Sequence, residues 1–198
     1  MSSASRHLIF PSPEAQRLRW TLPAPLTSAI SVLDNAQNPD GPREPYFQES
    51  RSTWHPISEE PMSYPLQSSI TVEIYQLDVW EHQWEEYHEH ADPNDSDCVF
   101  APSDDEGPGE LLECCGEQRP KVPPPVVVTA SNKEYITVHD YVSTVHSYLM
   151  EHFEDISAAE NVWEGGVPPA GQKLVVSYDS LQLLMIIDES MYLPTAGA

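Results

Sequence analysis

The sequence predicts an α+β fold, a small mixed sheet of short strands packed on one main helix. Apolar residues alternate with polar ones at Ile70, Val72 and Ile74, which is the period of a half-buried strand. Helical spacing of apolar residues begins at Val138. Between Val126 and Leu193, Leu, Ile, Val and Phe recur densely enough for a compact core.

The segment 1–65 differs from the rest of the chain in composition. It holds ten of the 20 prolines, and between Asp34 and Pro65 it contains only Phe47 and Ile57 from the Leu, Ile, Val and Phe class. So few apolar residues do not offset the conformational entropy of ordering the segment. We therefore expect 1–65 to be a Pro-rich, largely extended arm and 66–198 to be the domain. Whether Trp20 and its neighbours dock on that domain is left open.

The domain opens with a strand and a helix. Ser69–Tyr75 reads as the strand. After it, Leu77, Trp80, Trp84 and Tyr87 follow one another at helical spacing, which favours a short amphipathic helix. The alternative is a strand that continues to Trp80.

Residues 91–121 are rich in Asp, Glu, Pro, Gly and Ser, so we expect a disordered acidic insertion that interrupts the domain. Three prolines then lead into Val126–Thr129, a short apolar run that reads as a strand.

The main helix has a clear start signal. Thr137 at the N-cap, with Asp140 at the third helical position, forms a near capping box, and the apolar pattern continues to about Glu154. Ser157 with Glu160 predicts a second capping box that opens a short helix.

The C-terminal part supplies the remaining elements. Lys173–Tyr178 reads as a strand, whereas the period of Leu181–Ile187 does not distinguish strand from helix. On the main helix, His139 and His146 lie on a face away from the apolar arc, and His152 lies within that arc.

Three segments together resemble a family of small uncharacterised fungal domains: Ile70–Ile74, Val126–Thr129 and the helix start Thr137-Val138-His139-Asp140-Tyr141-Val142. Members carry paired short strands, an early Trp with a nearby Pro, and a Thr-Val-x-Asp-Val helix start followed by a Leu. In this chain, Trp20, Pro23 and Leu149 would take the remaining places, and the resemblance covers about residues 18–190. It implies a small α+β fold and no activity.

Negative charge is concentrated in the middle of the chain. The net charge is −23, and the segment 52–118 carries 17 acids and no Lys or Arg. A chain of this kind lacks the basic face that phosphate binding needs, so we expect neither nucleic acid nor a membrane surface as a direct partner. We expect the acidic insertion to bind a basic protein surface, although a purely solubilising loop is the alternative.

Several residues of the insertion are candidates for contact with such a partner. Apolar groups would be buried and carboxylates would pair with cations. The candidates are Phe100, Asp104, Asp105, Glu106, Leu111 and Leu112. Ser103, followed by three acids, also fits an acidophilic kinase site, and phosphate there would add about −1.5 to −2 charge.

A cluster of His82, His88 and His90 among glutamates raises a metal hypothesis, since imidazole and carboxylate are ligands for Zn²⁺. A metal-dependent hydrolase is its sharper form, because residues 88–92 match the first five positions of H-x-H-x-D-H, with Pro93 in the sixth. The three cysteines have no C-x-x-C spacing, so no zinc knuckle is expected from them.

The remaining motifs favour a protein without enzymatic activity. Neither a P-loop, a dinucleotide fingerprint nor H-E-x-x-H occurs. No apolar run is long enough to cross a bilayer and no signal peptide is evident, so a cytoplasmic or nuclear location is expected. The leading hypothesis is a non-enzymatic interaction domain, a metal-binding module is second, and a structural subunit with an obligate interface is third.

Overall fold

The computed structural model describes residues 9–103 and 107–191, and it confirms the α+β class. Its main sheet is mixed and has seven strands in the order β10-β6-β12-β11-β1-β2-β3. In chain order these are β1 (Leu18–Leu22), β2 (Ile30–Leu33), β3 (Arg43–Pro45), β6 (Ser69–Ile74), β10 (Val126–Thr129), β11 (Leu174–Ser177) and β12 (Leu183–Asp188).

Two smaller sheets and four α-helices complete the described part. One sheet pairs β4 (Phe47–Gln48) with β5 (Thr53–Trp54), and the other joins β7 (Cys98–Phe100), β8 (Leu111–Cys114) and β9 (Glu117–Gln118). The helices are α1 (Leu26–Ala29), α2 (Tyr75–Tyr87), α3 (Val138–Glu151) and α4 (Phe153–Glu160). Short 3₁₀ turns occur at Ala15–Arg17, Glu49–Arg51, Pro56–Glu59, Val162–Glu164 and Glu189–Met191.

The main sheet buries one face. Its neighbouring strands are antiparallel except β6 and β12, which run parallel. Ile74 and Leu184 are register partners in that parallel pair, and both are buried. Val127, Leu183 and Met185 alternate with buried neighbours and are exposed, so part of the opposite face meets solvent.

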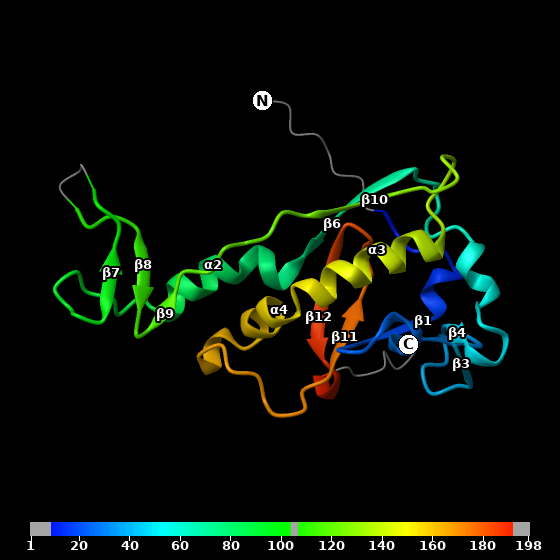
Figure 1. Ribbon diagram of the computed structural model, residues 1–198, viewed down its shortest axis with the longest axis horizontal. Coiled ribbons are helices and arrows are strands. Elements are labelled where there is room, and N and C mark those ends of the chain that lie inside the picture. Colours follow the sequence, from blue (N-terminus) through cyan, green and yellow to red (C-terminus); the bar gives the residue numbers. More distant parts are fainter. Residues whose placement is uncertain (1–8, 104–106, 192–198) are drawn as a thin grey trace.

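Helix α3 supplies the other half of the core (Figure 1). Its capping box is confirmed: the Thr137 hydroxyl accepts from the Asp140 backbone N–H at 3.0 Å, and the Thr137 N–H donates to the Asp140 carboxylate at 3.0 Å. Tyr141, Val145 and Leu149 are fully buried against the sheet. The Tyr141 hydroxyl donates to the Leu181 carbonyl at 2.8 Å, which satisfies the polar end of a buried ring.

Most element predictions in the domain are confirmed. Residues 69–74, 126–129 and 174–177 form strands, and the segment after β6 is a helix rather than a continued strand. Residues 183–188 resolve the ambiguous apolar run as a strand.

The helix boundaries after α3 differ from the prediction. Helix α3 ends at Glu151, and α4 begins at Phe153, so Ser157 lies inside α4 and does not cap a helix. Ser157 is buried, and its hydroxyl donates to the Gln172 side chain at 3.4 Å. Because the Ser157 hydroxyl bonds to a distant side chain, it does not cap the N-terminus of a helix.

The N-terminal segment is not an extended arm, so this prediction is wrong for the described residues. Strand β1 lies between β11 and β2 inside the main sheet, and Trp20 is only 1% exposed. The Trp20 indole N–H donates to His146 Nδ1 at 3.1 Å, and the Tyr46 hydroxyl lies 3.2 Å from His139 Nδ1. This segment therefore covers the α3 face that lies away from the apolar arc.

The reason is the kind of apolar residue used. Trp20, Tyr46 and Met62 are among the largest fully buried side chains, and none belongs to the Leu, Ile, Val and Phe class on which the prediction relied. Aromatic side chains bury more surface each than aliphatic ones, so fewer of them are needed.

The predicted disordered insertion 91–121 also differs, because its described residues contain β7, β8 and β9. Before β7, the Asn94 N–H donates to the Asp92 carboxylate and the Asp97 N–H donates to that of Asp95, which forms turns. Cys115 (φ 54°) and Gly116 (φ 82°) form the two-residue turn between β8 and β9. Acidic composition predicted disorder, whereas the turn residues favour a hairpin.

The longest helix in the described residues, α3, has 14 residues, and none of the helices there is long and apolar enough to cross a membrane.

Candidate functional site

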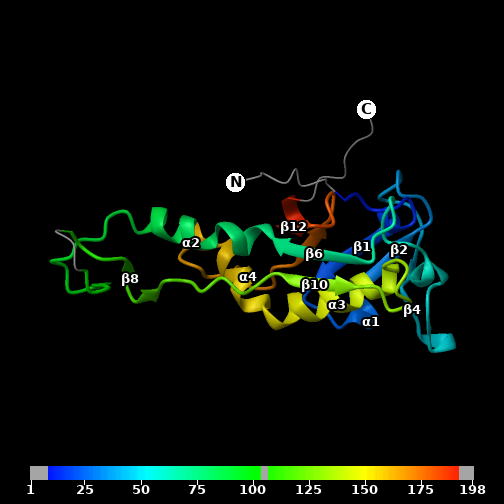
Figure 2. The ribbon, with the colours of Figure 1, turned by 90° about the horizontal axis from the view of Figure 1, so that it is seen from above.

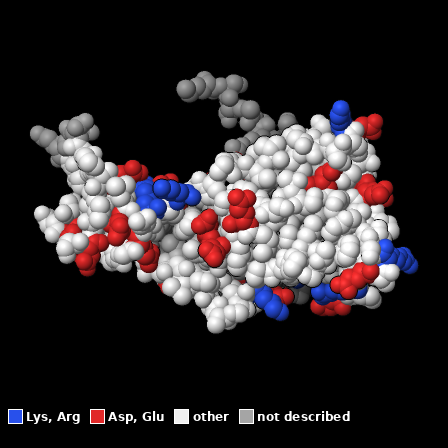
Figure 3. All heavy atoms as spheres, in the orientation of Figure 1, with Lys and Arg blue, Asp and Glu red and all other residues white. Residues whose placement is uncertain are grey.

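Residues 88–122 are here called the acidic arm. Its described parts, 88–103 and 107–122, extend from the C-terminal end of α2, with β7 and β8 beyond that end of the helix (Figures 1 and 2). The rest of the described chain, residues 9–87 and 123–191, is called the body. By sequence the acidic arm holds ten Asp or Glu against Arg119 and Lys121, a formal net charge of −8. On the face drawn in Figure 3, acidic side chains gather over this end of the molecule, beside a basic patch.

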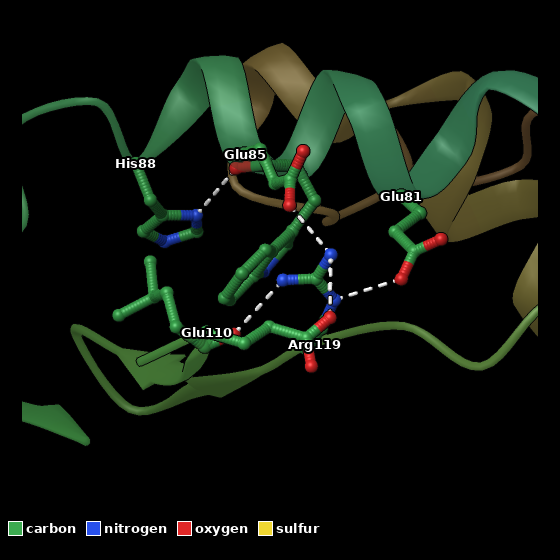
Figure 4. Close-up of polar contacts among 7 residues, drawn as sticks. Glu81, Glu85, His88, Glu110 and Arg119 are labelled. Atoms are coloured by element: carbon green, nitrogen blue, oxygen red, sulfur yellow. Dashed lines mark hydrogen bonds and ion pairs between the residues drawn. The ribbon is translucent and has the colours of Figure 1, made fainter. Parts of the chain in front are cut away.

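Arg119 joins the acidic arm to α2 (Figure 4). Its Nε donates to Glu81 at 2.7 Å, and its Nη2 donates to Glu85 at 2.5 Å and lies 3.1 Å from the Glu110 carboxylate. A third nitrogen donates to the Leu111 carbonyl at 3.1 Å. Burial lowers the pKa of Arg119, but its hydrogen bonds to Glu81 and Glu85 outweigh that effect and raise it. The guanidinium is thus a charged clamp between a helix and a hairpin.

The three candidate histidines do not converge on one site. His82 is exposed on α2, and its Nε2 lies 3.5 Å from Glu86. The His88 side chain is fully buried, with Nδ1 2.9 Å from the Trp84 carbonyl oxygen and Nε2 3.8 Å from the Glu117 carboxylate. His90 is exposed and lies against cysteines instead. The predicted His82/His88/His90 ligand set is therefore wrong as a single metal site.

His90 belongs to a different cluster. Its Nε2 lies 3.3 Å from Cys115 Sγ and 3.6 Å from Cys114 Sγ, and the two sulfurs are 3.7 Å apart. Cys98 Sγ lies 3.1 Å from Cys114 Sγ on the neighbouring strand. In the described residues, His90, Cys114 and Cys115 form a group of potential metal ligands within 4.8 Å of one another.

The hairpin brings these sulfurs together. Cys98 and Cys114 are register partners of β7 and β8. Cys115 follows in the left-handed region, which turns the chain so that adjacent side chains need not point to opposite faces as in a strand. Burial, followed by the hydrogen bonds that the Cys114 thiol makes with Cys98 and Cys115, raises the pKa of this thiol to about 12. Without a cation beside it, Cys114 is therefore a neutral thiol.

A groove of about 690 Å³ opens on the acidic arm. Val99, Leu112 and Val122 line it and are 47%, 40% and 44% exposed. Its charged lining consists of Glu81, Glu110, Glu113, Arg119 and Lys121. Of the predicted contact residues, Leu112 faces this groove. Phe100 and Leu111 pair across β7 and β8 and are half-buried, so they contribute less exposed surface.

The phosphorylation candidate Ser103 follows β7 and lies at the end of the described segment. Asp104, Asp105 and Glu106 lie outside the described residues.

Sequence reasoning missed Arg119 and the mixed His-Cys cluster. Arg119 is the first Lys or Arg after Arg51, and a single cation after so many acids could have indicated an ion-pair role. For the cysteine cluster the sequence offers a weaker indication, the Cys115-Gly116 dipeptide, which is compatible with a tight turn.

Comparisons with protein-family models, curated proteins and solved structures found no match. The resemblance to small fungal domains therefore stays a prediction.

Proposed function

We propose that this protein is a non-enzymatic interaction module, acting in the cytoplasm or nucleus, whose acidic arm binds a basic surface of a partner protein. The observation that carries the proposal is the groove of the acidic arm, which combines exposed apolar side chains with carboxylates. Exposed apolar side chains that gather in one groove and are rimmed by polar residues are typical of interaction sites.

The groove offers both parts of a recognition surface. Val99, Leu112 and Val122 are apolar groups that a partner would remove from water. The formal charge of −8 on the acidic arm attracts cationic partners over distances of about one Debye length, roughly 8 Å at physiological salt. The expected partner segment is therefore rich in Lys or Arg and carries at least one aliphatic anchor.

Arg119 and the exposed Lys121 also line the groove. The Arg119 guanidinium is paired with Glu81, Glu85 and Glu110, which offset its charge. Glu113 remains at the groove, where a cationic side chain would contact it.

The test is a pull-down with the full chain and a double variant, Leu112→Ser/Glu113→Lys. The matched control is Val127→Ser/Glu134→Lys, which makes the same chemical changes at exposed residues of the body. A partner retained by the wild type and the control, lost by the groove variant and weakened by added salt supports the proposal. An identical partner set for all three proteins would contradict it.

Phosphorylation of Ser103 would act on the same interaction. A phosphate there adds about −1.5 to −2 charge to the acidic arm and strengthens attraction to a basic partner. Treatment with an acidophilic kinase, followed by titration of the captured partner, should show tighter binding that Ser103→Ala abolishes. Unchanged affinity would remove Ser103 from the mechanism.

A further inference from the structure

We propose that His90, Cys114 and Cys115 bind a structural zinc ion, with Cys98 as the fourth ligand. The site lies in the acidic arm and stands apart from any partner protein, so its test needs only the purified chain. It replaces the predicted three-histidine site by a ligand set of which only His90 was among the predicted ligands.

The ligand atoms already lie close to the distances that a zinc ion requires. A tetrahedral zinc site with Zn–S of about 2.3 Å and Zn–N of about 2.0 Å places its sulfurs about 3.8 Å apart and sulfur about 3.5 Å from nitrogen. The structure has 3.7 Å between Cys114 and Cys115 Sγ, and 3.6 and 3.3 Å from these sulfurs to His90 Nε2. Three corners of the tetrahedron are therefore already arranged.

Cys98 supplies the fourth ligand atom. Its Sγ lies 3.1 Å from Cys114 Sγ, which is too long for a disulfide bond of about 2.05 Å. Cys98 lies outside the group of ligand atoms within 4.8 Å of one another, so its half-buried side chain would have to rotate to bring Sγ to the ion. A disulfide between Cys98 and Cys114 is the competing outcome, but it would leave the contact of Cys115 with His90 without a role.

The three-stranded sheet of the acidic arm lacks an apolar core. Strands β7, β8 and β9 have three, four and two residues, and among them only Cys114 is buried. Units this small fold with the help of disulfides or metals when their apolar core is insufficient. Here the one buried side chain of the sheet is itself a zinc ligand.

Proton balance sets the pH dependence of the site. Zinc binding replaces the protons of three thiols, which pass to solvent, so the ion and its ligands carry a net charge of about −1. Because the ligands must lose protons, zinc affinity should fall as pH decreases.

The experiment measures zinc in the full chain, purified with reductant and added zinc and then dialysed into metal-free buffer. Native mass spectrometry should find one zinc per chain, and Co²⁺ in its place should give the visible absorption of a tetrahedral thiolate site. Cys115→Ser and His90→Ala should each lower zinc affinity at least tenfold. Both residues are exposed, so circular dichroism should show that each variant still folds.

The matched control is His82→Ala, which removes an exposed histidine of α2 outside the cluster and should retain zinc fully. Cys98→Ser should weaken zinc binding, and unchanged affinity would overturn the assignment of the fourth ligand. A wild-type chain that loses all metal on dialysis, or that forms a Cys98–Cys114 disulfide in place of metal binding, would overturn the site. So would a site lost in His82→Ala and kept in Cys115→Ser.

Discussion

In the main sheet of the body, buried apolar side chains pack against α3, whereas in the three-stranded sheet of the acidic arm Cys114 alone is buried. The body thus draws its stability from removing apolar surface from water. The acidic arm is held by directional contacts instead, of which the Arg119 clamp and the His-Cys cluster are the clearest. The stability of the two regions should therefore respond differently to changes in solution conditions.

This difference has a consequence for function. A region fixed by a few polar contacts leaves its apolar side chains free for a partner, as Val99 and Leu112 illustrate. The body has most of its apolar groups committed to its core. Five substitutions test this contrast between the two regions.

The largest effect is expected from Trp20→Ala. It removes a fully buried indole from the centre of the sheet and leaves His146 without its N–H donor. Truncation of a buried aromatic residue costs about 3–5 kcal/mol. Chemical denaturation should show the loss in the free energy of unfolding, and Trp20→Phe should recover most of it. A loss below about 1 kcal/mol would contradict the place of Trp20 in the core.

Arg119→Met should destabilise the acidic arm and leave the body intact. It removes the cation that Glu81, Glu85 and Glu110 share, and hydrogen bonds to charged groups are worth about 1.5–3 kcal/mol each when buried, less at this partly exposed site. Limited proteolysis should cut the acidic arm faster while the body survives. Lys121→Met removes the neighbouring exposed cation and serves as the control; equal cleavage in both variants would count against the clamp.

Thr137→Ala should destabilise α3 by about 1 kcal/mol, because the Asp140 N–H loses its acceptor. Thr137→Ser keeps the hydroxyl and should remain within a few tenths of the wild type. Thermal denaturation of the three proteins checks this, and a Ser variant as unstable as the Ala variant would show that the methyl group matters instead.

Lowering the pH should destabilise the body through His146. Burial lowers its pKa, opposed by a backbone hydrogen bond at Ala24. Below its ordinary pKa of 6.5, the unfolded chain binds a proton that the folded chain does not, so stability is present above that pH and is lost as pH falls. Melting temperatures at about pH 7.5 and pH 5.5 should differ less for His146→Asn than for the wild type. Equal differences in melting temperature for the two proteins would exclude His146 as a source of the pH dependence.

The smallest stability effect is expected from Leu112→Ala, within about 0.5 kcal/mol, since the side chain is 40% exposed. Its effect should appear in partner capture instead. A large loss of stability from this variant would show that Leu112 belongs to a core and not to a binding groove.

Elements with local signals were predictable from the sequence. The alternation of apolar residues in β6 and the Thr137–Asp140 capping box each predict their element from a few neighbouring residues. The structure confirms both the strand and the helix start. Strand β1 pairs with the neighbouring β2 and also with β11 near the other end of the chain, and no local window contains the second pair. The alternation of Leu18, Trp20 and Leu22 was present, but proline-rich flanks outweighed it.

The candidate site was less predictable for a related reason. Cys98 and Cys114 lie 16 positions apart, and only the hairpin register brings their sulfurs together. Cys114 and Cys115 would point apart in a regular strand, and the positive φ of Cys115 is what changes this. His90 was among the predicted ligands, but its partners depended on tertiary structure.

We propose that metal and polar contacts hold the acidic arm, whereas an apolar core holds the body. Hydrogen–deuterium exchange of the zinc-loaded chain, before and after a chelator, tests it most directly. We predict faster exchange in β7, β8 and β9 after chelation, with α3 and the main sheet unchanged. Identical exchange of the acidic arm with and without chelator would contradict the account.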